Sequence, residues 1–179
     1  MNASAARDLE RLRAGERPAN RDAAWWAAIT GELLADLRPD DHALAVWLLE
    51  QEIAAISQSG ASQSGASQAG ADGLETLYRL VAAVARFARP ADALLIWRAA
   101  RATPETRLGV DVEQALRAGP EATLRTLHRL SAPGDSQAKD AAAALAWVEE
   151  GVAEGAASDL PAYFAWSDER FGLHISGPT

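Results

Sequence analysis

The chain has 179 residues, a formal net charge of −8 at pH 7 and no cysteine. The lack of cysteine excludes disulfide bonds, thiolate catalysis and cysteine-ligated zinc or iron–sulfur sites. The negative charge argues against a general nucleic-acid binder, which needs clustered positive charge, and against binding to anionic membranes.

At this length we predict a single helical domain over residues 1–179 that buries about 70% of its unfolded surface. No apolar run approaches the roughly 20 residues that span a bilayer, and the N-terminus lacks the apolar segment of a signal peptide. We therefore expect a cytoplasmic protein. Abundant alanine favours helices, and β-branched residues nowhere alternate over the length of a strand, so the predicted class is all-α.

Two helices are predicted near the N-terminus. Residues 4–14 have a narrow apolar stripe, and residues 21–37 carry apolar side chains at three- and four-residue spacing after Asn20, the expected N-cap. Trp25 and Trp26 are neighbours and point about 100° apart around the second helix. Burying both rings requires either a wide apolar face or a second contact surface.

The clearest internal similarity is between residues 38–47 and 89–97. Each copy has an Arg-Pro pair followed by an apolar segment that ends in tryptophan. We interpret each as a junction at which one helix ends and proline opens the next, with the tryptophan as an anchor. Four prolines are expected in such a first turn: Pro39, Pro90, Pro120 and Pro161.

Two-helix units of this spacing are typical of helical repeats. The predicted architecture is an array of antiparallel helix hairpins similar to an α-solenoid, or else a compact orthogonal helical bundle, with about 7–9 helices. The residue pattern matches no named repeat. The remaining helices are expected over 40–58, over 74–88, from Pro90 to about 102, over 110–118, from Pro120, over 136–150 and from Pro161. Thr103-Pro104 has the N-cap and proline of a helix start, and Gly109 is expected to divide the segment that follows into a turn and the helix over 110–118.

Two segments are expected to lie outside the helices. Residues 58–73 contain three pentapeptides of the type Gln-Ser-Gly-Ala-Ser and are predicted to form a flexible low-complexity insert. Residues 172–179 are predicted to form an extended C-terminal tail. The aromatic segment before the tail is expected to tie the C-terminus to the helices, whereas Asp168 and Glu169 could alternatively form an acid pair.

The sequence offers no catalytic constellation, and we assign no catalytic residue, cofactor or metal ligand. Asp40 and Asp41 precede His42 and could hold a divalent cation, but acids at a helix N-terminus are explained by capping. No further ligand follows at helical spacing. The histidines cannot be paired with a serine nucleophile on sequence grounds.

Six tryptophans and a local excess of arginine are the candidate binding features. The tryptophans either fill a core built from small alanines or line an aromatic groove; Trp25 and Trp26 are the candidates for the second role. Residues 73–109 carry a charge of +3 in an otherwise acidic chain. If two helix faces converge there, they form an arginine strip that could dock an acidic segment or a phosphate; otherwise the same side chains form intramolecular pairs. The strip would consist of Arg79, Arg86, Arg98 and Arg101.

From these features we expect a non-enzymatic protein–protein interaction module that uses a helical face with tryptophan anchors and the arginine strip. The partner is a protein of unknown identity, not nucleic acid or membrane, and a homo-oligomer through Trp25 or Trp26 is left open. The alternative is a small-ligand binder or enzyme with an inter-helix pocket lined by tryptophan and arginine. A third option, an acidic inhibitor of a basic partner, agrees with the net charge alone.

Overall fold

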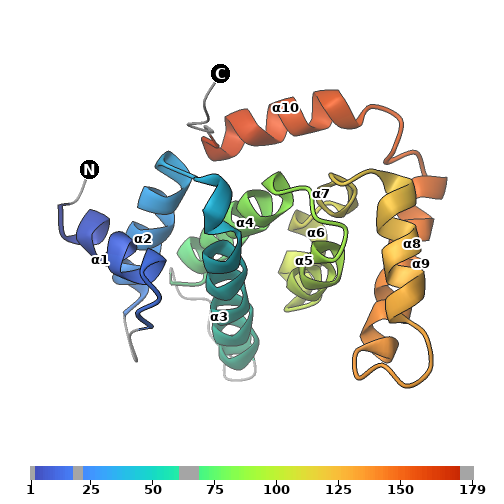
Figure 1. Cartoon of the computed structure of the whole chain (residues 1–179), viewed down its shortest axis with the longest axis horizontal. Helices are drawn as coiled ribbons and strands as arrows, with labels where there is room; N and C mark the ends of the chain where they lie inside the picture. The colour runs from blue at the N-terminus through green and yellow to red at the C-terminus, as the bar shows by residue number, and fades with distance from the viewer. Residues whose placement is uncertain (1–2, 18–21, 61–68, 174–179) are drawn as a thin grey trace.

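The computed structural model describes residues 3–17, 22–60 and 69–173, and within these ranges all regular secondary structure is helical (Figure 1). This confirms the all-α prediction. The described part has ten α-helices and one short 3-10 helix, close to the expected number. The elements are α1 (Ala3–Arg13), α2 (Ala23–Ala35), η1 (Pro39–Asp41), α3 (His42–Gly60), α4 (Ala69–Arg86), α5 (Asp92–Ala100), α6 (Pro104–Gly109), α7 (Val112–Ala115), α8 (Pro120–Leu130), α9 (Ala138–Ala153) and α10 (Leu160–Phe171).

The helices follow one another along the long axis of the molecule. The pairs α1–α2, α3–α4 and α8–α9 pack closely, α5 to α7 lie between them, and α10 runs back across the array to contact α4 (Figure 1). This return makes the packing that of a compact helical bundle. None of the helices in the described ranges combines the length and apolar character that a membrane-spanning segment needs.

The centre of the fold is α4. Its residues 80–85 are all buried, so this part of the helix is covered on every side. One face joins the main core, and Ala82 and Ala83 pack with Leu34 and Leu173 in a second cluster. The small alanines let neighbouring helices approach closely. Leu173, which follows the aromatic segment, makes part of the expected contact between the C-terminus and the helices.

Local signals account for most of the helix starts. Thr103 accepts a hydrogen bond from the Thr106 backbone N–H and is followed by proline, as expected, and Asp159 caps α10 in the same way. The cap of α2 differs from the expectation: Asp22 accepts the hydrogen bond from the Trp25 N–H. Asn20 lies outside the described residues. Asp22, whose short side chain lies next to the first turn, is the N-cap of α2.

Other boundaries also differ from the prediction. The segment after Thr103 forms two short helices, α6 and α7, where a turn and one helix over 110–118 were expected. α3 continues to Gly60 and α4 begins at Ala69, so the described ends of the predicted insert are helical, and residues 61–68 lie outside the described part. Gly172 ends α10 in the left-handed conformation, with φ 67°.

The two repeated junctions contact each other directly. His42 begins α3, Asp92 begins α5, and His42 Nε2 lies 2.8 Å from Asp92 Oδ2. The imidazole also packs edge-on against Phe87, with ring centroids 5.2 Å apart. Burial raises the pKa of the Asp92 carboxyl, and the hydrogen bond from His42 opposes that rise. The contact joins the first half of the chain to the second.

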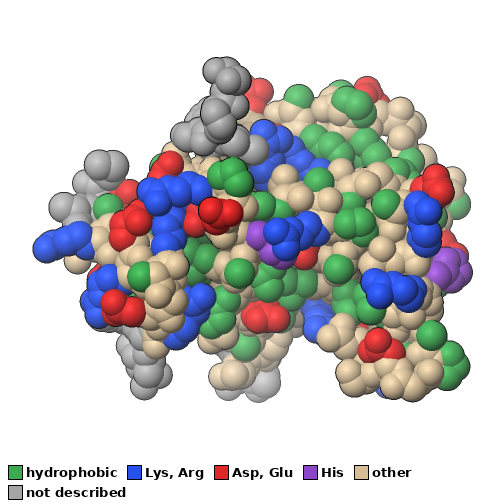
Figure 2. Space-filling model, viewed as in Figure 1, with side chains coloured by type: hydrophobic (Ala, Val, Ile, Leu, Met, Phe, Trp, Pro, Cys, Tyr) green, Lys and Arg blue, Asp and Glu red, His purple; other side chains and the backbone are tan. Residues whose placement is uncertain are grey.

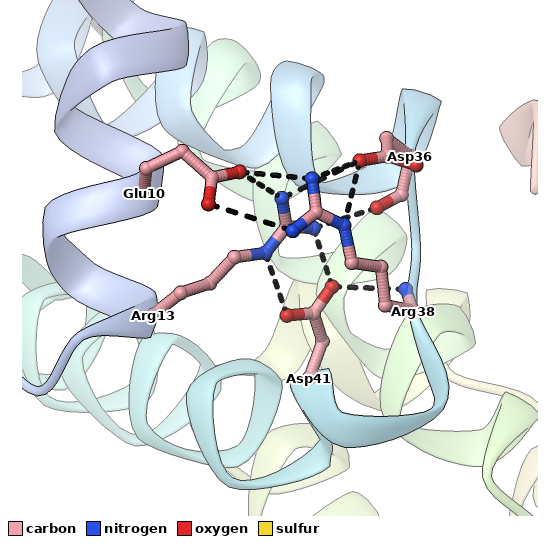
Figure 3. A network of polar contacts seen from close by, with 5 residues as sticks. All are labelled: Glu10, Arg13, Asp36, Arg38 and Asp41. Carbon is pink, nitrogen blue, oxygen red and sulfur yellow. Dashed lines mark hydrogen bonds and ion pairs between the residues drawn. The ribbon is translucent and has the colours of Figure 1, made fainter.

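An ion network fixes α1 against the junction of α2 and α3 (Figure 3). Arg13, the last residue of α1, donates from Nε and Nη2 to the carboxylate of Asp41 at 2.8 and 2.6 Å. Asp41 also accepts a hydrogen bond from the backbone N–H of Arg38, and it is only 3% exposed. Glu10 and Asp36 complete the network. Asp41 is thus committed to an arginine, and not to a metal ion.

We expect Asp41→Ala to lower the free energy of unfolding by about 3 kcal/mol, because it leaves the guanidinium of Arg13 largely buried beside an empty position. Urea denaturation measures this loss. The exposed neighbour provides the control: Asp40→Ala should change stability by about 0.5 kcal/mol or less. Equal effects of the two substitutions would contradict the structural role of the network.

Ala88, between α4 and α5, has a positive φ of 50°, a conformation that disfavours residues with a Cβ. We expect Ala88→Gly to raise stability by about 1 kcal/mol, since the relief of backbone strain exceeds the entropic cost of glycine. Ala143→Gly, at an exposed position inside α9, should instead lower stability by about 1 kcal/mol. Thermal unfolding of the two variants should therefore move in opposite directions.

Candidate functional site

A pocket of about 180 Å³ lies where α10 crosses α4, α6 and α7. A cavity of similar size, about 150 Å³, accommodates benzene, so this pocket has room for one side chain or a small planar group. Figure 2 shows hydrophobic side chains gathered on the face where α10 lies. The lining residues are Tyr78, Val81, Leu108, Gly109, Val110, Asp111, Gln114, Tyr163, Trp166, Arg170 and Phe171.

The floor and one rim come from α4 and α6. The Thr103 cap and Pro104 start α6 in a fixed direction, which leaves Leu108 at its outer end with 88% of its surface exposed. Gly109 lies directly against Tyr78, so that a Cβ at this position would overlap the phenol hydroxyl. Glycine is therefore required here for the Tyr78 ring to occupy the pocket wall in this position.

The opposite wall is one face of α10. Tyr163, Trp166 and Arg170 are three and four residues apart, so they share that face. The rings of Tyr163 and Trp166 are tilted with centroids 5.6 Å apart, and the guanidinium of Arg170 lies 5.2 Å from the Trp166 ring centroid. Trp166 is nonetheless 47% exposed. It forms the second apolar rim of the pocket.

A chain of hydrogen bonds connects the buried side of the pocket to its mouth. Gln114 donates from Nε2 to Ser167 Oγ at 2.7 Å and to Tyr163 Oη at 3.1 Å. The Tyr163 hydroxyl donates to Asp111 Oδ2 at 2.8 Å. Gln114 is 4% exposed, and its Oε1 has no hydrogen-bond partner among the described residues. The wall of the pocket thus holds a buried acceptor without a partner among the described residues.

Both tyrosines of the chain line this pocket. Burial raises the pKa of Tyr78, and the carboxylates of Glu105, Asp111 and Glu75 raise it further. Burial also raises the pKa of Tyr163, as do the charge of Asp111 and its hydrogen bond, with a smaller opposing effect of Gln114. The electrostatic potential at both hydroxyls is therefore negative.

A doubly paired carboxylate holds α10 in place. Arg117 donates from Nη1 and Nη2 to the two oxygens of Asp168 at 2.7 and 2.6 Å, and Arg86 approaches the same carboxylate at 2.7 Å. Arg117 also lies 4.6 Å from the ring centroid of Phe164. Asp168 therefore positions the helix that forms the pocket wall. Its two arginine contacts account for its place in the structure without the acid pair with Glu169 that was considered from the sequence.

The predicted tryptophan candidates lie elsewhere. Trp25 and Trp26 are partly buried, pack against the main core and contact each other edge-on with centroids 5.0 Å apart. Trp26 also packs on Trp47, and Trp25 donates from Nε1 to Asp8 at 2.9 Å. Neither ring lines the pocket. Their proposed role in partner binding or self-association stays a prediction.

The predicted arginine strip is distributed over separate partners. Arg79 pairs with Glu75 on α4, Arg86 with Asp168 on α10, and Arg98 with Asp140 on α9. The fourth member, Arg101, lies 6.0 Å from the ring centroid of Trp97. None of the four lines the pocket. The intramolecular pairs considered as the alternative are present, and docking of an acidic partner on these arginines stays a prediction.

Sequence reasoning did not select most of the pocket residues. The helical spacing of Tyr163, Trp166 and Arg170 was visible in the sequence and could have identified one wall. Leu108 and Gln114 gave no comparable signal, because their role depends on the crossing of α10. In the described ranges, no three histidine or acidic residues gather as metal ligands.

No protein-family model matches the chain, and neither the curated proteins nor the solved structures include a significant match.

We expect the pKa of both tyrosines to lie above about 10, the pH at which a free tyrosine is half ionised. Absorbance near 295 nm follows both, and Tyr163→Phe leaves Tyr78 as the only phenol. Because the folded state holds these protons more tightly, stability should be constant below about pH 10 and fall as the tyrosines ionise.

The control is the same titration in urea, where both phenols should regain ordinary behaviour. A native titration that matches the one in urea would contradict the negative, partly buried pocket described above.

Proposed function

We propose that this protein is a non-enzymatic protein-binding domain whose binding site is the pocket under α10. A single observation carries the proposal: in the described part of the chain, the two strongly exposed large hydrophobic side chains, Leu108 and Trp166, both line this one pocket. Scattered apolar side chains on a surface have no special meaning, whereas two that flank a concavity are typical of an interaction site.

The energetics favour a partner that covers both rims. Full burial of a leucine side chain contributes about 1.5–3 kcal/mol, and tryptophan is among the residues that most often dominate binding energy. Leu108 stands at the end of a short helix and Trp166 on a helix held by Asp168. Both are therefore held in position before binding, which lowers the entropic cost of association.

The partner in this proposal is a protein segment with one side chain that enters the pocket and apolar neighbours that cover the rims. The cytoplasmic location expected from the sequence remains part of the proposal. The face formed by Trp25 and Trp26 and the strip from Arg79 to Arg101 remain secondary predicted surfaces, since each has intramolecular contacts that account for it.

Selection from a displayed random-peptide library on the immobilised protein tests the proposal. We expect enrichment of peptides whose affinity falls at least about tenfold in Leu108→Ser and in Trp166→Ala, since each loses one apolar rim. Arg107→Ala is the matched control, because this exposed neighbour on α6 does not line the pocket.

All variants should keep the wild-type melting temperature within a few degrees, since the altered side chains are exposed. Failure to enrich any sequence, or enrichment that is indifferent to both rim substitutions, would refute this function.

A second candidate is binding of a small ligand in the same pocket. The specific support for it is the buried chain of polar groups that ends in the unpartnered Gln114 Oε1, since small-ligand sites combine an apolar lining with a few such groups. Thermal-shift screening with small polar aromatic compounds separates the two: a stabilising compound whose effect is lost in Gly109→Ala, and unchanged in Leu108→Ser, would favour this candidate.

A further inference from the structure

One side of the pocket is acidic, and its carboxylates have no basic side chain as a partner among the described residues. Asp111 lies at its mouth, Glu105 precedes it on α6, and Glu113 follows on α7. Among the described residues, these three carboxylates form no ion pair with any arginine, lysine or histidine, in contrast to Asp41 and Asp168. Their charge reaches the pocket interior, because Asp111 and Glu105 raise the pKa of Tyr78 and Asp111 and Glu113 that of Tyr163.

Aromatic rings surround this acidic side. Tyr78 comes from α4, and Tyr163 and Trp166 come from α10, so that the rings approach the pocket from different elements. The negative faces of such rings attract cations, most strongly when water is partly excluded. A guanidinium fits this environment best, because it is planar, stacks on aromatic rings and donates in a fork to a carboxylate.

At the buried end of the pocket, one hydrogen-bond acceptor has no partner among the described residues. Gln114 is more than nine-tenths buried, and its Oε1 accepts no hydrogen bond from the described residues. An acceptor left without a partner costs about 1–3 kcal/mol. The oxygen itself has almost no solvent-accessible surface, so the acceptor that a ligand with several N–H donors can reach is the exposed carboxylate of Asp111.

Among the described lining residues, Arg170 is the one basic residue, and its position affects where a second cation can bind. Its guanidinium lies over Trp166 and Phe171, at 5.2 and 5.4 Å from the ring centroids. These ring contacts hold its guanidinium beside the aromatic rim, and its positive charge opposes a second cation bound beside Asp111.

We infer that the pocket receives an arginine side chain of the protein partner, with its guanidinium against Asp111 and the tyrosine rings and its apolar neighbours on Leu108 and Trp166. The inference rests on the proposed function and specifies the chemistry of the partner. A positively charged partner residue also suits the net charge of the chain, which is −8 and attracts basic partners at a distance.

The test uses blocked pentapeptides Gly-Leu-Xaa-Leu-Gly in which the central residue is arginine, its neutral isostere citrulline, or glutamate. Isothermal titration calorimetry on the full chain measures the three affinities at low salt. We expect the arginine peptide to bind at least about tenfold more tightly than the citrulline peptide, because one charge-assisted hydrogen bond contributes a free energy of that order. The glutamate peptide should bind most weakly.

Two charge variants give opposite expectations. Asp111→Asn removes the acidic partner and should weaken binding of the arginine peptide about tenfold, with little effect on the citrulline peptide. Arg170→Gln removes the like charge and should strengthen binding of the arginine peptide. Leu108→Ser should weaken all peptides alike, because it removes an apolar rim and no charge.

The outcomes separate the two proposals. If Leu108→Ser weakens every peptide but arginine and citrulline bind equally, the protein-binding function stands and the arginine inference is overturned. Tighter binding of the glutamate peptide, or reversed effects of Asp111→Asn and Arg170→Gln, also overturns the arginine inference, since the pocket then prefers an anion. If binding of these peptides does not depend on Leu108, both proposals fail for this pocket.

Discussion

The enclosure of α4 by other helices is the constraint on which the rest of the structure depends. Residues 80–85 are buried on all sides, so α2, α3, α5 and α10 must each present a complementary surface to one helix. Alanine and valine make this possible, because small side chains allow several helices to approach the same segment. The position of α4 is then fixed, which places Tyr78 in the wall of the pocket and Arg86, the last residue of α4, beside Asp168 of α10.

Charged side chains join the elements that the apolar core does not hold. Arg13 fastens α1 to Asp41, His42 joins Asp92 across the two repeated junctions, and Asp168 draws α10 onto Arg86 and Arg117. These pairs link residues far apart in the chain and are shielded from water, so they define the arrangement of helices more than exposed pairs do. Within the positive middle segment, Arg86 pairs with Asp168 and Arg98 with Asp140, both acids of the C-terminal part.

The pocket follows from the same constraint. α10 crosses the array instead of extending it. Its Ser167 contacts Gln114 and its Asp168 pairs with Arg117, and this position leaves the Trp166 ring at the surface. The carboxylates on the acidic side of the pocket have no basic partner among the described residues, whereas the acids that hold the fold together do. This difference between carboxylates with and without a basic partner is the physical basis for the inference that the pocket receives an arginine.

The sequence by itself determined the helical class, several helix starts and the anchoring junctions, because these depend on local spacing, capping and proline. Thr103 begins its helix as expected, whereas Asp22 took the place of Asn20. Only the tertiary structure decided that the two junctions touch, that the arginines diverge to separate acids, and that Leu108 faces Trp166 across a pocket. The contacts that build the pocket join residues far apart in the chain, as between Gln114 and Ser167, and depend on where α10 crosses α4. No local pattern encodes that crossing, since it is set by the summed packing of every helix around α4.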